Sequence, residues 1–399
     1  MKKGVLVPAL LEGARLKRRI RQHLKKLGFE RQDDGSLAPP SGAKEVLRGM
    51  HAPQRAARLT QNRSFIEDNK KLLLSALADG SEIAPEKIAL ELRRIRKETR
   101  ESDLFRLASL TWSVPVSNGF GRRLRYLVWD KYHDRLAGLI ALGDPVFNLG
   151  VRDRLIGWSA QDRAKRLANV LDAYVLGAVP PYSNLLGGKA VASVVRTREI
   201  YDDFLAEYGA IPGVISGKNK RARLLLVTTS SSLGRSSIYN RIKLDGRPYF
   251  NSIGFTEGWG HFHISDDLFL DLREFLRQSA HPYADENRYG QGPNWRLRTI
   301  REALKILGLS EDVLHHGLKR EVFACEFASN ALSILRAGRG QPDLTSLKST
   351  REVSALAVSR WMLPRSLRDN SYANFRKIDF LNQLLNDQGP SHADRASLG

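Results

Sequence analysis

Apolar residues near the start of the chain recur at the spacing of one helix face. Leu16, Ile20, Leu24 and Leu27 form such a stripe, and Gly28 is typical of the position just after a helix C-terminus. We therefore predict a helix over residues 15–27, whose remaining faces carry lysine and arginine. Because helical periods return, the first hundred residues are predicted to be mostly helical, with further helices at about 43–58, 63–79 and 85–98.

The pattern changes near Thr111, where strand-like runs begin. Residues 124–129 and 136–142 flank a short charged segment and predict an antiparallel hairpin. Ser159 is a suitable N-cap for a helix that reaches about residue 171. Further strands are predicted at 173–179, 224–229, 249–254 and 259–264, and a second helix at about 185–208. This alternation predicts an α+β fold with a mixed sheet and surrounding helices.

Helical patterns return toward the C-terminus, from about residue 296 and again over roughly 350–386, before a polar tail. Together with the change of pattern near Thr111, this predicts three segments. A basic helical region spans 1–110, an α/β core spans 111–335, and a helical extension with a polar tail spans 336–399.

The net charge of the chain indicates what kind of partner it binds. The chain carries 64 Lys and Arg against 43 Asp and Glu, a net charge of +21, which is typical of proteins that bind a polyanion. No apolar run approaches the ~20 residues that span a bilayer, and Pro8 interrupts the short apolar stretch at the start, so we expect neither membrane insertion nor secretion. The single Cys325 excludes an internal disulfide and fits a reducing cytoplasm.

The excess cations concentrate in two segments, residues 1–31 and 216–247. If each folds onto one face, its side chains fit phosphate groups, and tyrosines among them could stack on bases. The alternative is an ordinary solvated face, and the net charge of the whole chain favours DNA or RNA. The candidate nucleic-acid contacts are Arg18, Arg19, Arg21, Lys25, Lys218, Lys220, Arg221, Arg235, Arg241 and Lys243.

Long sequence strings in the middle of the chain resemble the DruA family. They lie at 142–158, 172–182, 185–189, 228–240 and 253–263, and the resemblance spans about 15–335. It implies an antiviral role in the Druantia anti-phage defence system, beside other Druantia proteins that include a large helicase-like one. It implies no known reaction.

A second resemblance concerns the fold of the core. A strand, Pro180-Pro181-Tyr182, a Gly-Gly turn and a helix, followed by an apolar strand and Tyr239, look like the core of a GNAT acyltransferase. In that superfamily the loop after the fourth strand cradles the pyrophosphate of an acyl-CoA. The resemblance implies that Gly187, Gly188 and Lys189 bind such a cofactor, since glycines permit close backbone approach and lysine favours an anion. The usual Gln/Arg-x-x-Gly-x-Gly/Ala spacing is absent here.

Three side chains are candidates for catalysis. Tyr239 stands where acyltransferases often keep a tyrosine as general acid, although the sequence favours a packing residue with a satisfied hydroxyl. His261 and His263 would share one side of a strand and could serve acid–base chemistry. Because no further ligands are seen to converge on the two histidines, we predict no metal site.

Three functions therefore stay open from the sequence. The chain could be a nucleic-acid-binding subunit of a defence complex, a GNAT-like acyl- or group-transferase within it, or an assembly scaffold without enzymatic activity.

Overall fold

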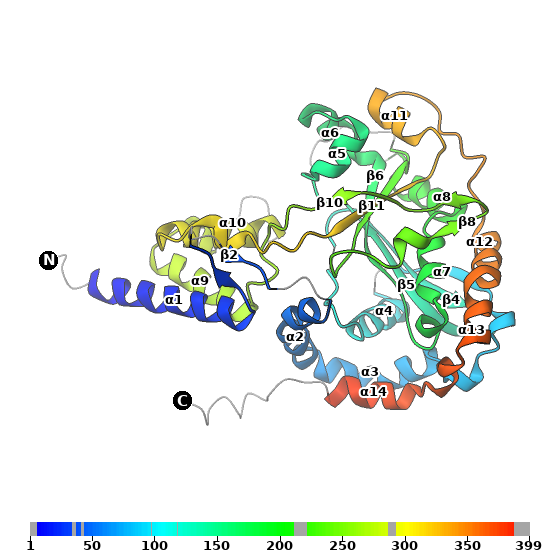
Figure 1. The fold of residues 1–399 in the computed structure, drawn as a ribbon, viewed down its shortest axis with the longest axis horizontal. Coiled ribbons are helices and arrows are strands. Elements are labelled where there is room, and N and C mark those ends of the chain that lie inside the picture. Colours follow the sequence, from blue (N-terminus) through cyan, green and yellow to red (C-terminus); the bar gives the residue numbers. More distant parts are fainter. Residues whose placement is uncertain are drawn as a thin grey trace. The chain divides into compact units, whose positions relative to one another are not determined.

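The computed structural model describes residues 6–33, 37–40, 44–96, 98–117, 119–210, 222–285 and 293–386. The chain forms two compact units, each made of two stretches of sequence (Figure 1). Unit 1 comprises residues 1–55 and 256–320, and unit 2 comprises residues 56–255 and 321–399. The three segments expected from the sequence, 1–110, 111–335 and 336–399, stay a prediction.

Unit 1 is built mainly from helices. Helix α1 (Leu6–Lys26) packs against α9 (Asp266–Gln278), which packs against α10 (Pro293–Ile306). A two-stranded hairpin, β1 (Glu30–Arg31) and β2 (Leu37–Ala38), follows α1. The first part of α2 (Lys44–Gln61) also belongs here.

The predicted helix over 15–27 is confirmed and begins earlier. Its apolar stripe is buried, with Leu16, Ile20 and Leu24 at most 5% exposed. Gly28 ends the helix with a φ of +83°, and the Phe29 N–H donates to the Leu24 carbonyl at 3.0 Å. This bond is the one expected when a left-handed glycine follows a helix.

Unit 2 is organised around a seven-stranded sheet with the order β10-β11-β7-β6-β5-β4-β3. Neighbouring strands are antiparallel except β6 and β7, which are parallel. The strands are β3 (Leu90–Arg94), β4 (Arg123–Asp130), β5 (Arg135–Gly143), β6 (Val170–Ala178), β7 (Leu226–Ser230), β10 (Asn251–Phe255) and β11 (Glu321–Glu326).

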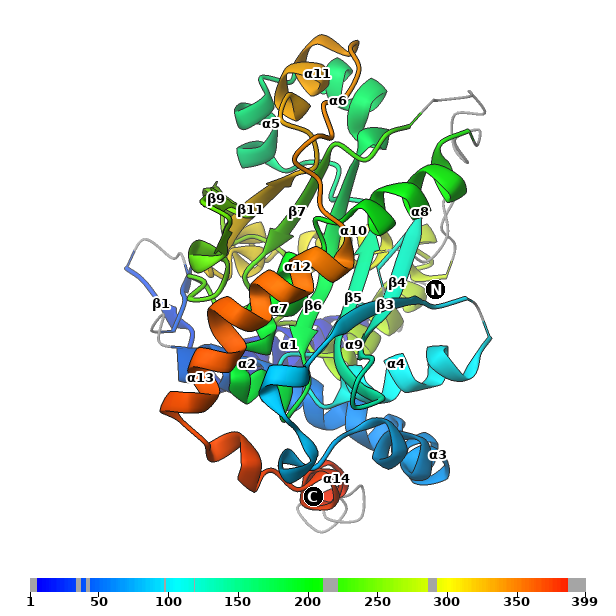
Figure 2. The same ribbon diagram turned by 90° about the vertical axis from the view of Figure 1, so that its right-hand side faces the viewer.

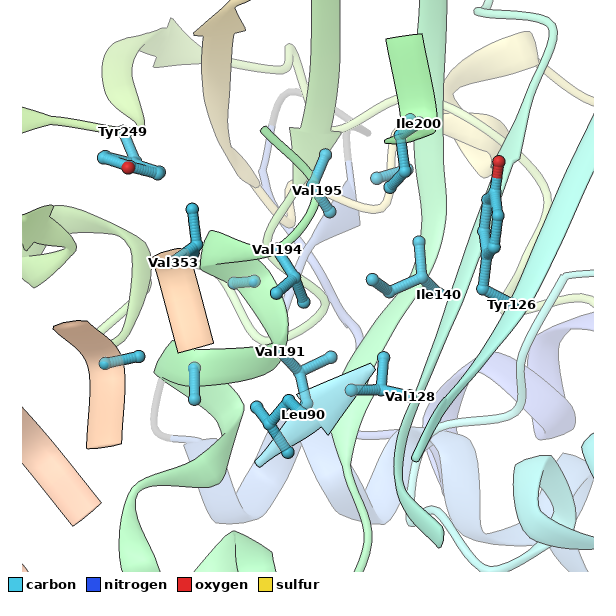
Figure 3. Close-up of a cluster of buried hydrophobic side chains, with 14 of the residues drawn as sticks. Leu90, Tyr126, Val128, Ile140, Val191, Val194, Val195, Ile200, Tyr249 and Val353 are labelled. Atoms are coloured by element: carbon cyan, nitrogen blue, oxygen red, sulfur yellow. The ribbon is translucent and has the colours of Figure 1, made fainter. Parts of the chain in front are cut away.

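Two of the apolar cores of unit 2 lie between its helices and the sheet. The first core lies under α7 (Gly187–Ser193), α8 (Arg198–Tyr208) and α12 (Thr350–Ala357), which Figure 2 shows in front of the strands. Figure 3 shows part of it, where Val191 and Ile200 approach Ile140 of the sheet. The second core lies under α3 (Arg63–Ala76), α4 (Arg100–Leu110) and α14 (Lys377–Asn386).

Short elements complete unit 2. Helices α5 (Gly150–Ile156) and α6 (Ala160–Arg166) link β5 to β6, and α11 (Ala331–Ala337) packs against α5. After α12 come the π-helical segment η8 (Val358–Met362) and α13 (Leu363–Arg368). Within the described ranges, each helix is too short or too polar to cross a lipid bilayer.

The α+β class with a mixed sheet is confirmed, and so are the hairpin of β4 and β5 and the N-cap at Ser159. That side chain accepts a hydrogen bond from the Asp162 N–H and forms a capping box with it. The predicted helix over 85–98 is wrong, because Leu90–Arg94 pairs with β4 as the edge strand β3. The helix expected over 185–208 is broken between α7 and α8. Strand β11, which lies between β10 and β7, is absent from the prediction made from the sequence.

Candidate functional site

The exposed face of α1 is cationic. Residues at 15, 18, 22 and 25 follow helical spacing on the side opposite the buried stripe. We call the following five exposed side chains the basic face of α1: Arg15, Arg18, Arg21, Lys25 and Lys26. Among the described residues, no ion pair is recorded for any of them, whereas the predicted contact Arg19 pairs with Asp271 of α9. The sequence therefore predicted three members of this face, Arg18, Arg21 and Lys25.

The second predicted basic cluster is described only in part. Arg235 lies in the turn after β7, Arg241 in the 3-10 helix η5 (Tyr239–Arg241) and Lys243 in the short strand β8 (Lys243–Leu244), and all three are exposed. The other predicted contacts of this cluster lie outside the described residues, and they are Lys218, Lys220 and Arg221.

Lys189 lies near cations that belong to other elements. Its Nζ lies 5.6 Å from the centroid of the Trp361 ring. Burial lowers the pKa of Lys189, and the nearby charges of Arg241, Arg360 and Arg368 lower it further. In the part of the chain that the structure describes, none of these four cations has a recorded ion pair. Cations close enough to lower the pKa of one lysine favour a bound anion beside it.

The two glycines before Lys189 occupy different surroundings. A Cβ at Gly187 would lie 2.4 Å from the carbonyl oxygen of Tyr182, so only glycine fits there without a shift of the backbone. A Cβ at Gly188 would have its nearest contact at 3.6 Å, with Ile238. Gly187 therefore allows the chain to turn tightly into α7, and the predicted contact of both glycines with a cofactor stays a prediction.

The parallel strands β6 and β7 separate soon after they begin. Their pairing runs from Val170 opposite Leu226 to Asp172 opposite Thr228. Beyond that point β6 continues along β5 alone, and β7 continues along β11 alone. We call the separation of the two strands beyond Asp172 and Thr228 the opening between β6 and β7. The Thr229 hydroxyl spans its start, because it donates to the Ala173 carbonyl at 2.9 Å.

Asp172 lies where the two strands part. Its Oδ1 accepts a hydrogen bond from the Thr228 hydroxyl at 2.8 Å. Burial raises the pKa of Asp172 to about 6, although the Thr228 hydrogen bond and the charge of Arg152 act in the opposite direction. A carboxyl with a pKa near neutrality can accept and release protons. Our sequence reasoning missed Asp172, whose only signal was a lone acid within an apolar strand.

Tyr239 is packed beside this opening. Its ring centroid lies 5.3 Å from that of Phe250 and 5.2 Å from that of Phe323. Burial raises the pKa of Tyr239 to about 12, while a hydrogen bond with Thr229 lowers it. These contacts agree with a packing role, and the predicted role as a general acid stays a prediction.

The strand predicted over 259–264 is wrong, so His261 and His263 do not share one side of a strand. The segment is a turn, in which Gly260 has a φ of +150°. The His263 Nε2 lies 2.7 Å from the Val313 carbonyl oxygen, and its ring contacts that of His316 at 5.7 Å. Burial lowers the pKa of both His261 and His263 to about 4, so both imidazoles are neutral at pH 7.

Neither histidine is placed in a metal site. In the ranges that the structure describes, no group of three or more His, Cys, Asp or Glu side chains could hold a metal ion. Cys325 is buried in β11, where burial raises the pKa of its thiol to about 12. A thiol with so high a pKa is a poor nucleophile at neutral pH.

Comparison with known proteins identifies a family and one relative within it. A family profile described as Druantia protein DruA matches residues 41–337. A Druantia protein DruA from Escherichia coli (strain UMEA 4076-1) is 54% identical over 384 residues, which cover 96% of this chain and 95% of the relative. No solved structure matches.

Proposed function

Because this chain belongs to the DruA family of Druantia proteins, we propose that it serves the Druantia anti-phage defence system by binding nucleic acid through the basic face of α1. Family membership supports the role in defence. The binding of nucleic acid is our own inference from the charge of the chain and from the surface of this helix.

One observation carries the proposal. The basic face of α1 exposes five cations along consecutive turns, and none has a recorded ion pair within the described ranges. A solvated helix face in a stable protein commonly mixes both signs of charge. A row of cations of one sign instead matches the spaced phosphates of a nucleic-acid backbone, whose condensed counterions are released on binding.

Salt dependence tests the proposal directly. We expect a labelled duplex to bind at about 50 mM salt and to be weakened steeply at about 200 mM, since the logarithm of the affinity falls by roughly 0.9 per phosphate contact for each tenfold rise in salt. The variant with Arg15, Arg18, Arg21 and Lys25 changed to Gln should lower this slope by about 3 to 4.

A control variant tests whether the loss of binding is specific to this face or follows from any loss of surface lysines. Lys70 and Lys71 are exposed on α3 of unit 2, and changing both to Gln should leave the salt slope within about one contact of the original. The proposal fails if the unaltered protein binds neither DNA nor RNA at low salt. The assignment to α1 fails if both variants change the slope equally.

We propose further that the bound strand is passed to a helicase-like protein of the same system, as the family resemblance implies. Co-purification of the two proteins from infected cells, with nuclease treatment as a control, tests this. A complex that forms only through shared nucleic acid would disappear after nuclease treatment.

A group-transferase is the second candidate, because one region of unit 2 combines an anion-favouring cluster with acid–base groups. Lys189 lies on α7, the helix that follows β6, and Asp172 lies near the start of β6, with Tyr239 beside the opening between β6 and β7. Tyr239 and Arg241 belong to the same short element, η5. We propose that a phosphorylated cofactor such as an acyl-CoA would lie along this opening.

Calorimetry with acetyl-CoA and longer acyl-CoAs tests the second candidate. We expect measurable binding that Lys189→Gln weakens, together with reduced phage protection by Tyr239→Phe. Absence of binding to every acyl-CoA would remove this candidate. If nucleic acid also fails to bind, an assembly role without enzymatic activity is favoured.

A further inference from the structure

The loop between β5 and α5 exposes two adjacent apolar side chains. Val146 is 54% exposed and Phe147 is 50% exposed. Isolated exposed apolar residues are common on protein surfaces and need no special explanation. This pair differs because buried charged groups hold its backbone in place.

Arg152 fixes the backbone of both exposed residues. Its side chain is completely buried, with an exposure of 0%. Its Nη1 donates to the Val146 carbonyl at 2.8 Å, and its Nη2 donates to the Phe147 carbonyl at 2.9 Å. Its Nε and Nη2 also donate to Asp153 Oδ1, at 2.9 and 2.7 Å. Burying a guanidinium is unfavourable unless such partners are present, so the loop is built around this cation.

The start of the same loop is also held by an ion pair. Arg122 Nε donates to Asp144 Oδ1 at 2.7 Å, and the Arg122 backbone N–H donates to Asp144 Oδ2 at 3.1 Å. A Cβ at Gly121 would collide with the Asp144 carboxylate. The loop is therefore anchored at both ends, and Val146 and Phe147 are displayed from a fixed backbone.

One cation contacts the exposed ring, and two others lie on the helices that follow the loop. The guanidinium carbon of Arg163 lies 4.5 Å from the centroid of Phe147, and Arg163 is held there because its Nη1 donates to Asp153 Oδ2 at 2.7 Å. Arg154 is exposed, and a Cβ at Gly150 would lie 3.2 Å from its Nη1, so its guanidinium lies beside the loop. Lys165 is exposed on α6.

Charge decides what kind of partner fits this surface. Residues 150–166 contain five cations and two acids, and both acids already form ion pairs with arginines. Arg154 and Lys165 are the cations of this segment for which the described residues show no ion pair. An apolar protein partner would bury these charges without compensation, whereas a nucleic-acid strand offers both a base for the ring and phosphates for the cations.

We propose that Phe147, with Val146 beside it, is a stacking platform for a base of a single-stranded nucleic acid, with Arg154 contacting the neighbouring phosphate. This inference rests on the proposed nucleic-acid binding and adds which form of nucleic acid unit 2 recognises. A base can stack on the ring only if it is free of a duplex, so the platform distinguishes single strands from double strands.

The test compares a labelled single strand with its duplex on the full chain. Phe147→Ala should weaken binding of the single strand by roughly 5- to 150-fold, the range measured for loss of one stacked base, and should leave the duplex affinity within about twofold. Phe147→Trp should retain single-strand binding. Arg154→Gln should lower the salt slope for the single strand by about 0.7, whereas Phe147→Ala should leave that slope unchanged because stacking releases no counterions.

Tyr132 provides a matched control. It is 56% exposed in the turn between β4 and β5 and has a cation over its ring, with Lys87 Nζ 5.1 Å from the centroid. It precedes β5, whereas Phe147 follows β5, so the two rings lie near opposite ends of that strand. Tyr132→Ala should leave single-strand affinity within about twofold of the original.

The outcomes separate this inference from the proposed function. If the unaltered protein binds no nucleic acid, both fail. If it binds, but Phe147→Ala is indistinguishable from Tyr132→Ala on the single strand, the stacking platform is overturned and the basic face of α1 still stands. Loss of phage protection by Phe147→Ala with unchanged single-strand affinity would also overturn the platform and assign the loop to a protein partner.

Discussion

Replacing Arg152 with methionine removes the buried cation that holds the loop before α5. Methionine fills most of the same volume and keeps apolar contacts with the surrounding side chains. The Val146 and Phe147 carbonyls lose their donors, and Asp153 loses one of its two arginine partners. The change therefore isolates the polar role of Arg152 from its packing.

The expected loss of stability follows from these contacts. Hydrogen bonds to a charged group contribute about 1.5–3 kcal/mol each, and breaking a buried ion pair costs about 3–5 kcal/mol. Two terms reduce the sum, because Asp153 retains Arg163 and because the buried guanidinium no longer has to be desolvated. We expect the free energy of unfolding of unit 2 to fall by about 3 kcal/mol.

Urea unfolding followed by tryptophan fluorescence measures this loss. The control is Arg154→Met, which changes an exposed arginine on the same helix and should alter the free energy of unfolding by less than about 0.5 kcal/mol. A loss below about 1 kcal/mol for Arg152→Met would refute the view that this cation holds the loop, since a single charged hydrogen bond already contributes more.

Three further predictions concern other parts of the chain. Burial lowers the pKa of His263 to about 4 from an ordinary value near 6.5, so the unfolded state binds more protons between these values. His263 alone should remove about 2 kcal/mol of the stability of unit 1 at pH 5, and His261, whose pKa is lowered to the same value, adds to this loss. His263→Asn should therefore make the urea midpoint less dependent on pH. Gly187→Ala should destabilise unit 2 by about 2–3 kcal/mol through its clash with the Tyr182 carbonyl, whereas Gly188→Ala should leave the melting temperature equal or higher; equal melting of the two variants would contradict the packing argument. Ser159→Ala should cost about 1 kcal/mol in thermal unfolding through loss of the N-cap, and an unchanged melting temperature would show that the cap is dispensable.

Two segments of the chain fit one local pattern and fold into another. Residues 85–98 satisfied a helical period, yet Leu90–Arg94 became an edge strand because β4 offered it backbone hydrogen bonds and the Trp129 ring packs against Arg93. Residues 259–264 alternated like a strand, yet Gly258 and Gly260 have positive φ values and the segment turns. Neither the pairing partner nor the backbone angle is visible in a local pattern.

The sequence alone determined individual helices of this protein and the kind of partner that its charge favours. The amphipathic period and Gly28 specify α1, Ser159 specifies the start of α6, and the excess of cations indicates a polyanion, because each depends on residues within one or two helical turns. The strings shared with the DruA family were also visible without any structure.

Tertiary structure alone decided which distant side chains meet. Lys189, Arg360 and Arg368 come together from segments more than 160 residues apart, and Asp172 acquires its raised pKa only where β6 parts from β7. Arg152 and Arg154 are the same residue type in the same short helix, yet Arg152 is buried under the loop and Arg154 is exposed. Burial and proximity depend on how the whole chain packs, so residue type and spacing along one segment could not determine them.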